Sequence, residues 1–237
     1  MASYITNRKN MTDSLDISIL ELVNGSSSSF WDAFMLVMTS GYTWIPLYIA
    51  LLYLVIYNSE TMSHIMLVVG CTLLCVILSG GLCDYIVKPL VGRLRPINDP
   101  MLCNIIVSAS KAIPKDFSFF SSHAANTISI TVFFSLLVRN MKLFVALLIW
   151  SLTNCYTRMY LGLHYPSDIL VGLLWGAIMG FLVYSLYVKL YSKIFSSGEF
   201  ISTQYTSKGY TISTVDVVLC VITLIYIISM MIAFIMV

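Results

Sequence analysis

The sequence predicts an all-α fold: a polytopic membrane bundle of six transmembrane helices, preceded by an N-terminal amphipathic helix at the membrane interface. The 237 residues are 59% hydrophobic and only 10% charged, whereas a soluble domain carries about 25% charged residues. Apolar runs recur along the chain, and short polar connections separate them. A net charge of +2 is too small to indicate a nucleic-acid partner, so we expect none.

Residues 1–41 are expected to form interfacial and short helices ahead of the bundle. Residues 14–23 carry apolar side chains on a helical period, and Asp16 and Glu21 lie on the opposite face. This pattern is typical of a helix that lies in the membrane interface. The residues before this helix are polar, so we expect no secretory signal. A second short apolar helix is expected over residues 30–40.

Residues 42–237 are expected to hold the six crossings, and the whole chain, 1–237, to form a single integral membrane domain. The first crossing is short and follows Gly41, so we expect a broken or tilted span. The predicted crossings cover residues 42–57, 62–87, 122–138, 143–156, 168–191 and 214–237. Helices joined by such short connections pack as one bundle.

Counting the crossings assigns each connection to one side of the membrane. Connections 88–122 and 158–167 fall on the same side, together with both termini. Connections 58–61, 139–142 and 192–213 fall on the other side. The candidate functional segments, all within residues 88–168, are therefore expected to meet at one membrane face.

Three smaller patterns carry structural expectations. Glycines recur at every fourth position of the fifth predicted crossing, at Gly172, Gly176 and Gly180. Small residues at that spacing let two helices approach closely. Asp84 precedes Lys88 by one helical turn, so we expect an ion pair at that helix end. Cys83 and Cys103 fall on the same side of the membrane, and whether they pair is left open.

Three polar segments at the predicted site face contain permanent cations, namely Lys88, Arg95 and Arg158. Ionisable groups at such a depth are costly and by default mark a functional site. Arginine binds phosphate oxygens in pairs, and lysine adds a compact charge. Ser121 and Ser122 open the third crossing, and a helix N-terminus binds anions. We therefore predict a phosphate site. Contacts with anionic lipids would also explain the cations, but not the histidines described next.

His123, His164 and Asp168 supply the groups that phosphoryl transfer needs. Asp168 follows His164 by four residues and can orient the imidazole as a nucleophile. His123 can protonate the leaving oxygen and then activate the water that hydrolyses the phosphohistidine. The sequence has no carboxylate cluster suited to Mg²⁺. We therefore expect metal-independent chemistry with no cofactor.

These segments resemble the signature motifs of the type-2 phosphatidic acid phosphatase superfamily, the lipid phosphate phosphatases, over about residues 24–191. The matching positions are Lys88-x6-Arg95-Pro96, Ser121-Ser122-His123 and Arg158-x5-His164-x3-Asp168. The resemblance implies that Lys88, Arg95 and Arg158 bind phosphate. It further implies that His123 acts as acid and base, that His164 becomes phosphorylated and that Asp168 activates His164.

The chain departs from the family pattern at three positions. Phe120 stands where the family usually has Pro, Ser122 where it has Gly, and Thr157 where it has Ser. Ser121 is expected to keep its phosphate contact. The Ser122 hydroxyl either narrows the pocket or adds a hydrogen-bond donor to it.

The resemblance implies a bacterial membrane lipid phosphatase whose substrate is a phospholipid or isoprenoid lipid. Undecaprenyl diphosphate, lipid A phosphate and phosphatidylglycerol phosphate all remain candidates. Lysines and arginines are balanced between the two sides, so charge does not orient the chain. The resemblance implies a cytoplasmic (inner) membrane location with the site facing the periplasm or exterior. A lipid phosphotransferase and a non-catalytic lipid-binding or transport bundle remain alternatives, and the oligomeric state stays open.

Overall fold

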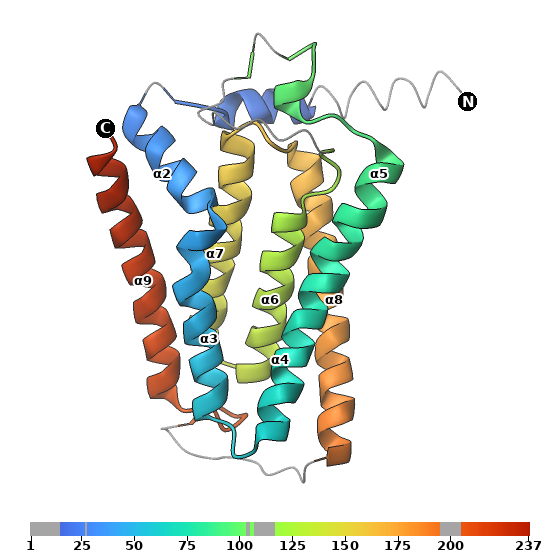
Figure 1. Cartoon of the computed structure of the whole chain (residues 1–237), viewed down its shortest axis with the longest axis vertical. Coiled ribbons are helices and arrows are strands. Elements are labelled where there is room, and N and C mark those ends of the chain that lie inside the picture. The colour runs from blue at the N-terminus through green and yellow to red at the C-terminus, as the bar shows by residue number, and fades with distance from the viewer. Residues whose placement is uncertain (1–14, 27, 103–104, 107–116, 195–204) are drawn as a thin grey trace.

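The computed structural model describes residues 15–26, 28–102, 105–106, 117–194 and 205–237, and these are mostly helical. The long helices run side by side along one common direction (Figure 1). The C-terminal end of α9 lies at the same end of the bundle as α5 (Figure 1). The principal elements are α2 Ser29–Thr39, η1 Gly41–Trp44, α3 Ile45–Tyr57, α4 Met62–Val76, η2 Ile77–Gly81, η3 Cys83–Val87, α5 Lys88–Val91, η4 Pro96–Asn98, α6 Ser122–Val138, α7 Met141–Tyr160, α8 Pro166–Ile194 and α9 Ile212–Ile235.

The helix ends follow local sequence signals. The Thr61 side chain accepts a hydrogen bond from the His64 N–H at the start of α4. Asn140 caps α7 in the same way, and α8 begins at Pro166, which suits the first turn of a helix. α2 and the following helix, which runs from Gly41 to Tyr57, are bent by 65°. The expected broken first segment is therefore present.

Among the described residues, three helices are long and apolar enough to cross a membrane: Met62–Asn98, Pro166–Lys193 and Ile212–Ile235. The bent pair made by α2 and α3 supplies a fourth candidate. The other two predicted crossings, 122–138 and 143–156, are not among the helices that are long and apolar enough. α6 is a shorter apolar helix, and α7 contains buried polar residues such as Asn154 and Thr157. The count of six crossings therefore stays a prediction.

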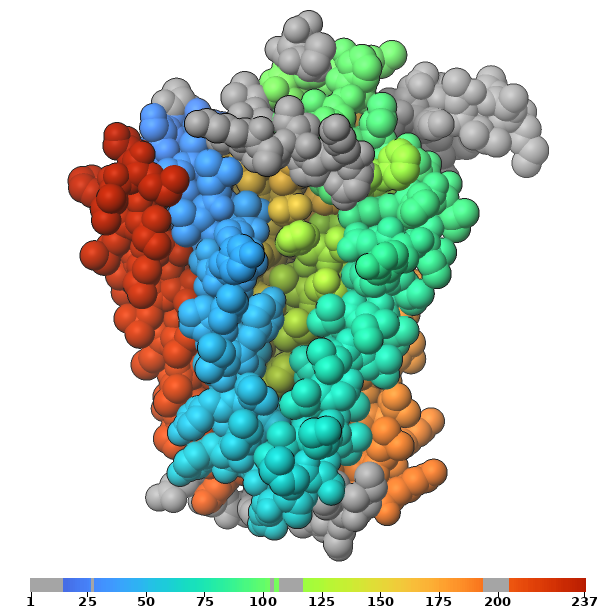
Figure 2. Space-filling model, viewed as in Figure 1, coloured from blue at the N-terminus to red at the C-terminus, as the bar shows by residue number. Residues whose placement is uncertain are grey.

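α6 occupies the interior of the bundle. Its buried residues occur all around the helix, and it contacts α4, η2, α7 and α8. On one face of the molecule, α3 and α4 leave part of α6 visible between them (Figure 2). A pocket of about 130 Å³ with a mostly apolar lining lies among these three helices. α8, by contrast, exposes Leu170, Leu174 and Phe181, as expected for side chains that face lipid.

Glycines on α8 bring it into backbone contact with α6, which confirms the expected close packing. A Cβ atom on Gly172 would lie 2.6 Å from the Ser121 carbonyl oxygen, and one on Gly176 would lie 2.1 Å from the Ala125 carbonyl oxygen. Gly180 meets the next turn of α6 at a similar distance. The start of α6 is consequently held against the start of α8, where the second and third sequence motifs lie.

The N-terminal helix is present but differs from the expectation. Residues 15–23 are helical and lie across the end of the bundle (Figure 1). Asp16, predicted to lie opposite the apolar side chains, is buried, whereas Leu15, Ile19 and Leu22 are exposed. The reason is electrostatic, because the Asp16 carboxylate is bound by Arg93.

The question of whether Cys83 and Cys103 pair lies partly outside the described residues, because Cys103 is not among them. Cys83 is a buried free thiol, and it donates a hydrogen bond to the Phe120 carbonyl oxygen at 3.0 Å. This bond ties η3 to the segment before α6.

Replacing Gly176 by alanine is expected to destabilise the protein by about 1–3 kcal/mol, because the added methyl group would overlap the α6 backbone. The measurement is the free energy of unfolding in detergent micelles. Gly70→Ala is the matched control, since a Cβ atom on Gly70 has nothing within 4 Å. Equal stability of the two variants would contradict the close packing of α6 and α8.

Candidate active site

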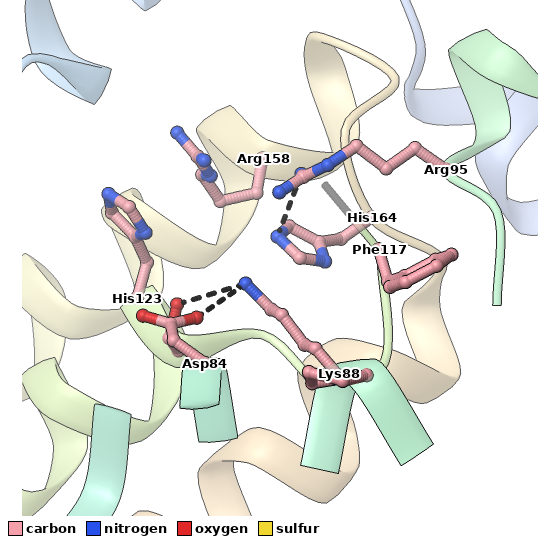
Figure 3. A pocket seen from close by; sticks show the side chains of 9 residues that line it. Asp84, Lys88, Arg95, Phe117, His123, Arg158 and His164 are labelled. Atoms are coloured by element: carbon pink, nitrogen blue, oxygen red, sulfur yellow. Dashed lines mark hydrogen bonds and ion pairs between the residues drawn. The ribbon is translucent and has the colours of Figure 1, made fainter. Parts of the chain in front are cut away.

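Residues from all three sequence motifs line one pocket of about 470 Å³ at the end of the bundle. Cationic and imidazole side chains converge on it, together with the Asp84 carboxylate (Figure 3). The lining residues are Asp84, Lys88, Pro89, Arg95, Phe117, Ser122, His123, Arg158 and His164. The structure therefore brings the three motifs together in one pocket, whereas its position at a membrane face stays a prediction.

A tight turn places His164 on the pocket wall. Gly162 adopts a left-handed conformation with φ of +66°, and the Leu163 N–H donates to the Arg158 carbonyl oxygen at 2.9 Å. Arg95 donates from Nη1 to the Leu163 carbonyl oxygen at 2.9 Å. The same Nη1 lies 3.3 Å from Nε2 of His164. Nε2 therefore faces the cations of the pocket.

The other ring nitrogen of His164 faces Asp168, as the four-residue spacing predicts. The distance from Nδ1 to Asp168 Oδ2 is 3.8 Å, which is too long for a direct hydrogen bond. The Ser118 hydroxyl lies 3.4 Å from Nδ1 and donates a short hydrogen bond to Asp168 Oδ2. Ser118 is fully buried. Sequence reasoning missed it, because nothing in its local pattern distinguishes it from other serines near the second motif.

Asp168 is itself fully buried and is neutralised by Arg93. The Arg93 Nη1 atom lies 2.7 Å from Asp168 Oδ1, while the Tyr165 N–H donates to Oδ2 at 3.1 Å. The Arg93 guanidinium also stacks 3.8 Å from the centre of the Tyr165 ring. A buried carboxylate requires such pairing. Sequence reasoning gave Arg93 no role in the site, although its position two residues before Arg95 was a signal.

Asp16 connects the N-terminal helix to this arrangement. Its carboxylate lies 3.0 Å from Arg93 Nη2 and accepts a hydrogen bond from the Ser167 N–H at 2.9 Å. A negative charge at the first turn of a helix is stabilising. Asp16 therefore contacts both Arg93 and the start of α8, one residue before Asp168.

The predicted phosphate-binding cations are held by defined partners. Lys88 is buried, and its Nζ atom lies 2.6 Å from Asp84 Oδ1, which confirms the expected ion pair. Arg158 lies in the last turn of α7 and donates from Nη1 to the Thr39 hydroxyl at 2.8 Å. Contacts made before a ligand arrives keep these long side chains in place, which reduces the ordering cost of binding.

The start of α6 gives its two serines different surroundings. The Ser121 side chain caps the helix, accepting from the Ala124 N–H at 3.4 Å. The Ser121 N–H donates to the Asp168 carbonyl oxygen at 3.1 Å. Ser122 lines the pocket, and its hydroxyl lies 3.4 Å from Lys88 Nζ. The phosphate contact of Ser121 stays a prediction, and Ser122 places on the pocket wall a hydroxyl that accepts a hydrogen bond from Lys88.

The arrangement can bind a tetrahedral dianion and attack it. Three cations can neutralise charge on phosphate oxygens. A buried imidazole nitrogen and a second imidazole from another helix line the same pocket. Within the described part of the chain, no group of three or more His, Cys, Asp or Glu residues is arranged to hold a metal ion. The expected independence from metals stays a prediction.

Comparison with known proteins gives relatives with named activities. A lipid A 4′-phosphatase of Bacteroides thetaiotaomicron is 35% identical over 171 residues, which cover 72% of this chain and 76% of that protein. A lipid A 4′-phosphatase of Porphyromonas gingivalis is 30% identical, covering 70% of each chain. The undecaprenyl-diphosphatase BcrC of Bacillus subtilis is 27% identical, covering 72% of this chain and 83% of that protein.

Two solved structures share the fold. The crystal structure of LpxE from Aquifex aeolicus has a TM-score of 0.56 at 24% identity, covering 72% of this chain and 95% of that one. A PAP2 type phosphatidylglycerolphosphate phosphatase from Bacillus subtilis has a TM-score of 0.57 at 20% identity, covering 76% and 88%. The family model described as the PAP2 superfamily matches residues 68–192. With its three motifs at one pocket, this chain belongs to the PAP2 superfamily, that of the type-2 phosphatidic acid phosphatases.

Proposed function

We propose that the chain hydrolyses a phosphate ester on the head group of a membrane lipid, through a phosphohistidine formed on His164. Family membership makes the chain a membrane lipid phosphatase. The observation that carries the mechanism is the position of the His164 ring. Nε2 lies against Arg95 at the pocket, and Nδ1 lies against Ser118 and Asp168. Two of the relatives are lipid A 4′-phosphatases, so a sugar-linked lipid phosphate is the first candidate substrate.

In the first step, Lys88, Arg95 and Arg158 bind the phosphate oxygens, and His164 Nε2 attacks phosphorus. The P–N bond forms as the bond to the leaving oxygen breaks, and His123 donates its proton to that oxygen. Burial, joined by the charges of Arg158 and Arg95, lowers the pKa of His164 to about 4, although Asp168 acts in the opposite direction. His164 is therefore neutral and nucleophilic at pH 7.

In the second step, water attacks the phosphohistidine and His123 accepts its proton. The P–N bond breaks, inorganic phosphate leaves, and His164 returns to the neutral form. His123 therefore serves as acid in the first step and as base in the second, as microscopic reversibility requires.

The proposal includes six crossings and a site that faces the periplasm or cell exterior of a bacterial cytoplasmic membrane. α6 and α7 need less apolar surface than a lone span, because neighbouring helices cover much of both. Leu170 and Leu174 on the outer side of α8 are exposed, which supports contact with lipid. The pocket lies at the end of the bundle, where a head group at the bilayer surface can reach it.

The chain has three histidines, which permits a matched set of variants. With a lipid A-type substrate labelled on phosphorus, His164→Gln is expected to abolish phosphate release and enzyme labelling. His123→Gln is expected to slow release about 100- to 10,000-fold, the usual contribution of a general acid. With an aryl phosphate, whose leaving group needs no acid, His123→Gln is expected to accumulate an acid-labile phosphohistidine.

His64→Gln is the control, since His64 hydrogen-bonds Tyr187 at 3.0 Å outside the pocket, and it should keep wild-type activity. Release of phosphate by His164→Gln would refute the mechanism. Transfer of label to an acceptor molecule instead of water would identify a phosphotransferase. Loss of activity in EDTA would contradict metal-independence.

The pH dependence of kcat/KM is expected to follow the lowered pKa of His164. Only the neutral imidazole is a nucleophile, so protonation lowers the rate, and the lowered pKa moves this loss to acidic pH. The His164 form needed for attack persists from pH 7 to about 5, and kcat/KM falls as pH approaches about 4. Ionisation of the substrate phosphate is measured separately by phosphorus NMR and divided out. If the corrected kcat/KM still falls with a midpoint near pH 6.5, the assignment of His164 as the nucleophile with a lowered pKa is contradicted.

Arg93 and Asp16 are proposed as positioning residues for Asp168, because neither lines the pocket. Arg93→Met and Asp16→Asn are expected to lower kcat on the order of 10- to 100-fold with little change in KM, as for groups that orient a functional side chain. The double variant should lose little more than Arg93→Met alone. Glu21→Gln, exposed on the same helix, should be unaffected. Additive losses, or losses confined to KM, would exclude the positioning role.

A further inference from the structure

One carboxylate lines the pocket among the cations. Asp84 lies in η3, a π-helical segment directly before Lys88, and such segments are frequent at functional sites. Its side chain is 48% exposed, whereas that of Lys88 is 6% exposed. In Figure 3 the Asp84 carboxylate points toward the Lys88 ammonium, on the side of the pocket where His123 lies. A carboxylate in an anion pocket opposes binding of any ligand with excess negative charge.

The charges of the lining groups favour one class of phosphate. Among the described residues, three cations and one carboxylate line the pocket, so Asp84 offsets one of the three positive charges that bind phosphate oxygens. A phosphomonoester carries a charge of about −2 near neutral pH. A diphosphate brings about one further negative charge into a pocket wall that already holds the Asp84 carboxylate.

We infer that Asp84 is a specificity-determining residue that favours phosphomonoesters over diphosphates. This inference rests on the proposed function, because it uses the assignment of His164 as nucleophile and His123 as acid. In-line displacement puts the leaving group opposite His164 and next to His123. In a diphosphate the leaving group begins with a second phosphate, whose oxygens would lie on the Asp84 side. In a sugar phosphate it begins with a carbon–oxygen bond, and neighbouring hydroxyl groups can donate to Asp84.

A simpler role for Asp84 makes a different prediction. If the carboxylate only orients Lys88, its loss weakens monophosphate and diphosphate equally, since both present a phosphate to the Lys88 ammonium. If it repels the second phosphate, its loss changes the ratio between the two substrates. The ratio therefore distinguishes the two roles, even when the absolute activity falls.

The test compares Asp84→Asn with the wild type on a polyisoprenyl monophosphate and the diphosphate of the same chain. The ratio of kcat/KM for diphosphate to that for monophosphate is expected to rise about tenfold in the variant, from loss of one close like-charge contact. Glu21→Gln removes one negative charge from the N-terminal helix, outside the pocket, and should leave the ratio unchanged. An unchanged ratio in Asp84→Asn overturns the inference.

A binding measurement separates this inference from the proposed function. Inorganic phosphate and pyrophosphate are titrated while the melting temperature of the detergent-solubilised protein is followed, which yields both affinities without catalysis. Asp84→Asn is expected to bind pyrophosphate about tenfold better relative to phosphate, and Glu21→Gln is expected to match the wild type. Equal affinity ratios in all three proteins overturn the inference. Failure of the wild type to hydrolyse these two lipids and a lipid A-type phosphate refutes only the proposed function.

Discussion

The burial of the Asp168 carboxylate is the constraint on which the rest of the site depends. A fully buried carboxylate needs a counter-charge and hydrogen-bond donors for both oxygens. The chain supplies them from segments far apart in sequence: Arg93 from the end of the first motif, Ser118 from the segment before α6 and the Tyr165 N–H from the turn before α8. Satisfying one anion therefore brings the three motifs together. These contacts also fix the position of His164, because its ring lies between Asp168 and Arg95.

The cations of the pocket are likewise held in place by contacts with other protein groups. Arg95 is fixed by the Leu163 carbonyl oxygen, Arg158 by Thr39 and Lys88 by Asp84. Donors fixed before the substrate arrives need no reorganisation as charge develops, which is where electrostatic catalysis gains most of its effect. The anchors described for Arg95 and Arg158 are neutral groups, whereas the one described for Lys88 is an anion. The Lys88 contact therefore alters the electrostatic balance of the pocket as well as its geometry.

Local spacing predicted much of the site, and long-range packing determined the remainder. The four-residue step from His164 to Asp168 and the serines at the start of α6 follow from helix geometry, so their positions could be predicted. Ser118, Arg93 and Asp16 could not, because their contacts join residues 50, 75 and 151 positions apart. α7 itself continues four residues beyond the predicted end of the fourth crossing, to Tyr160, and Thr157 and Arg158 in that last turn are buried.

The orientation of the N-terminal helix has a physical explanation if the helix lies at a membrane surface. A helix at a membrane surface can direct its apolar side chains toward lipid, and exposed Leu15, Ile19 and Leu22 are compatible with that environment. Asp16 can then turn inward, where it meets the Arg93 guanidinium and the first turn of α8. In water the same orientation would expose apolar surface and bury a charge, both unfavourable. At a membrane surface the first cost would be absent, and Arg93 offsets the second. The N-terminal helix thereby becomes part of the support for Asp168.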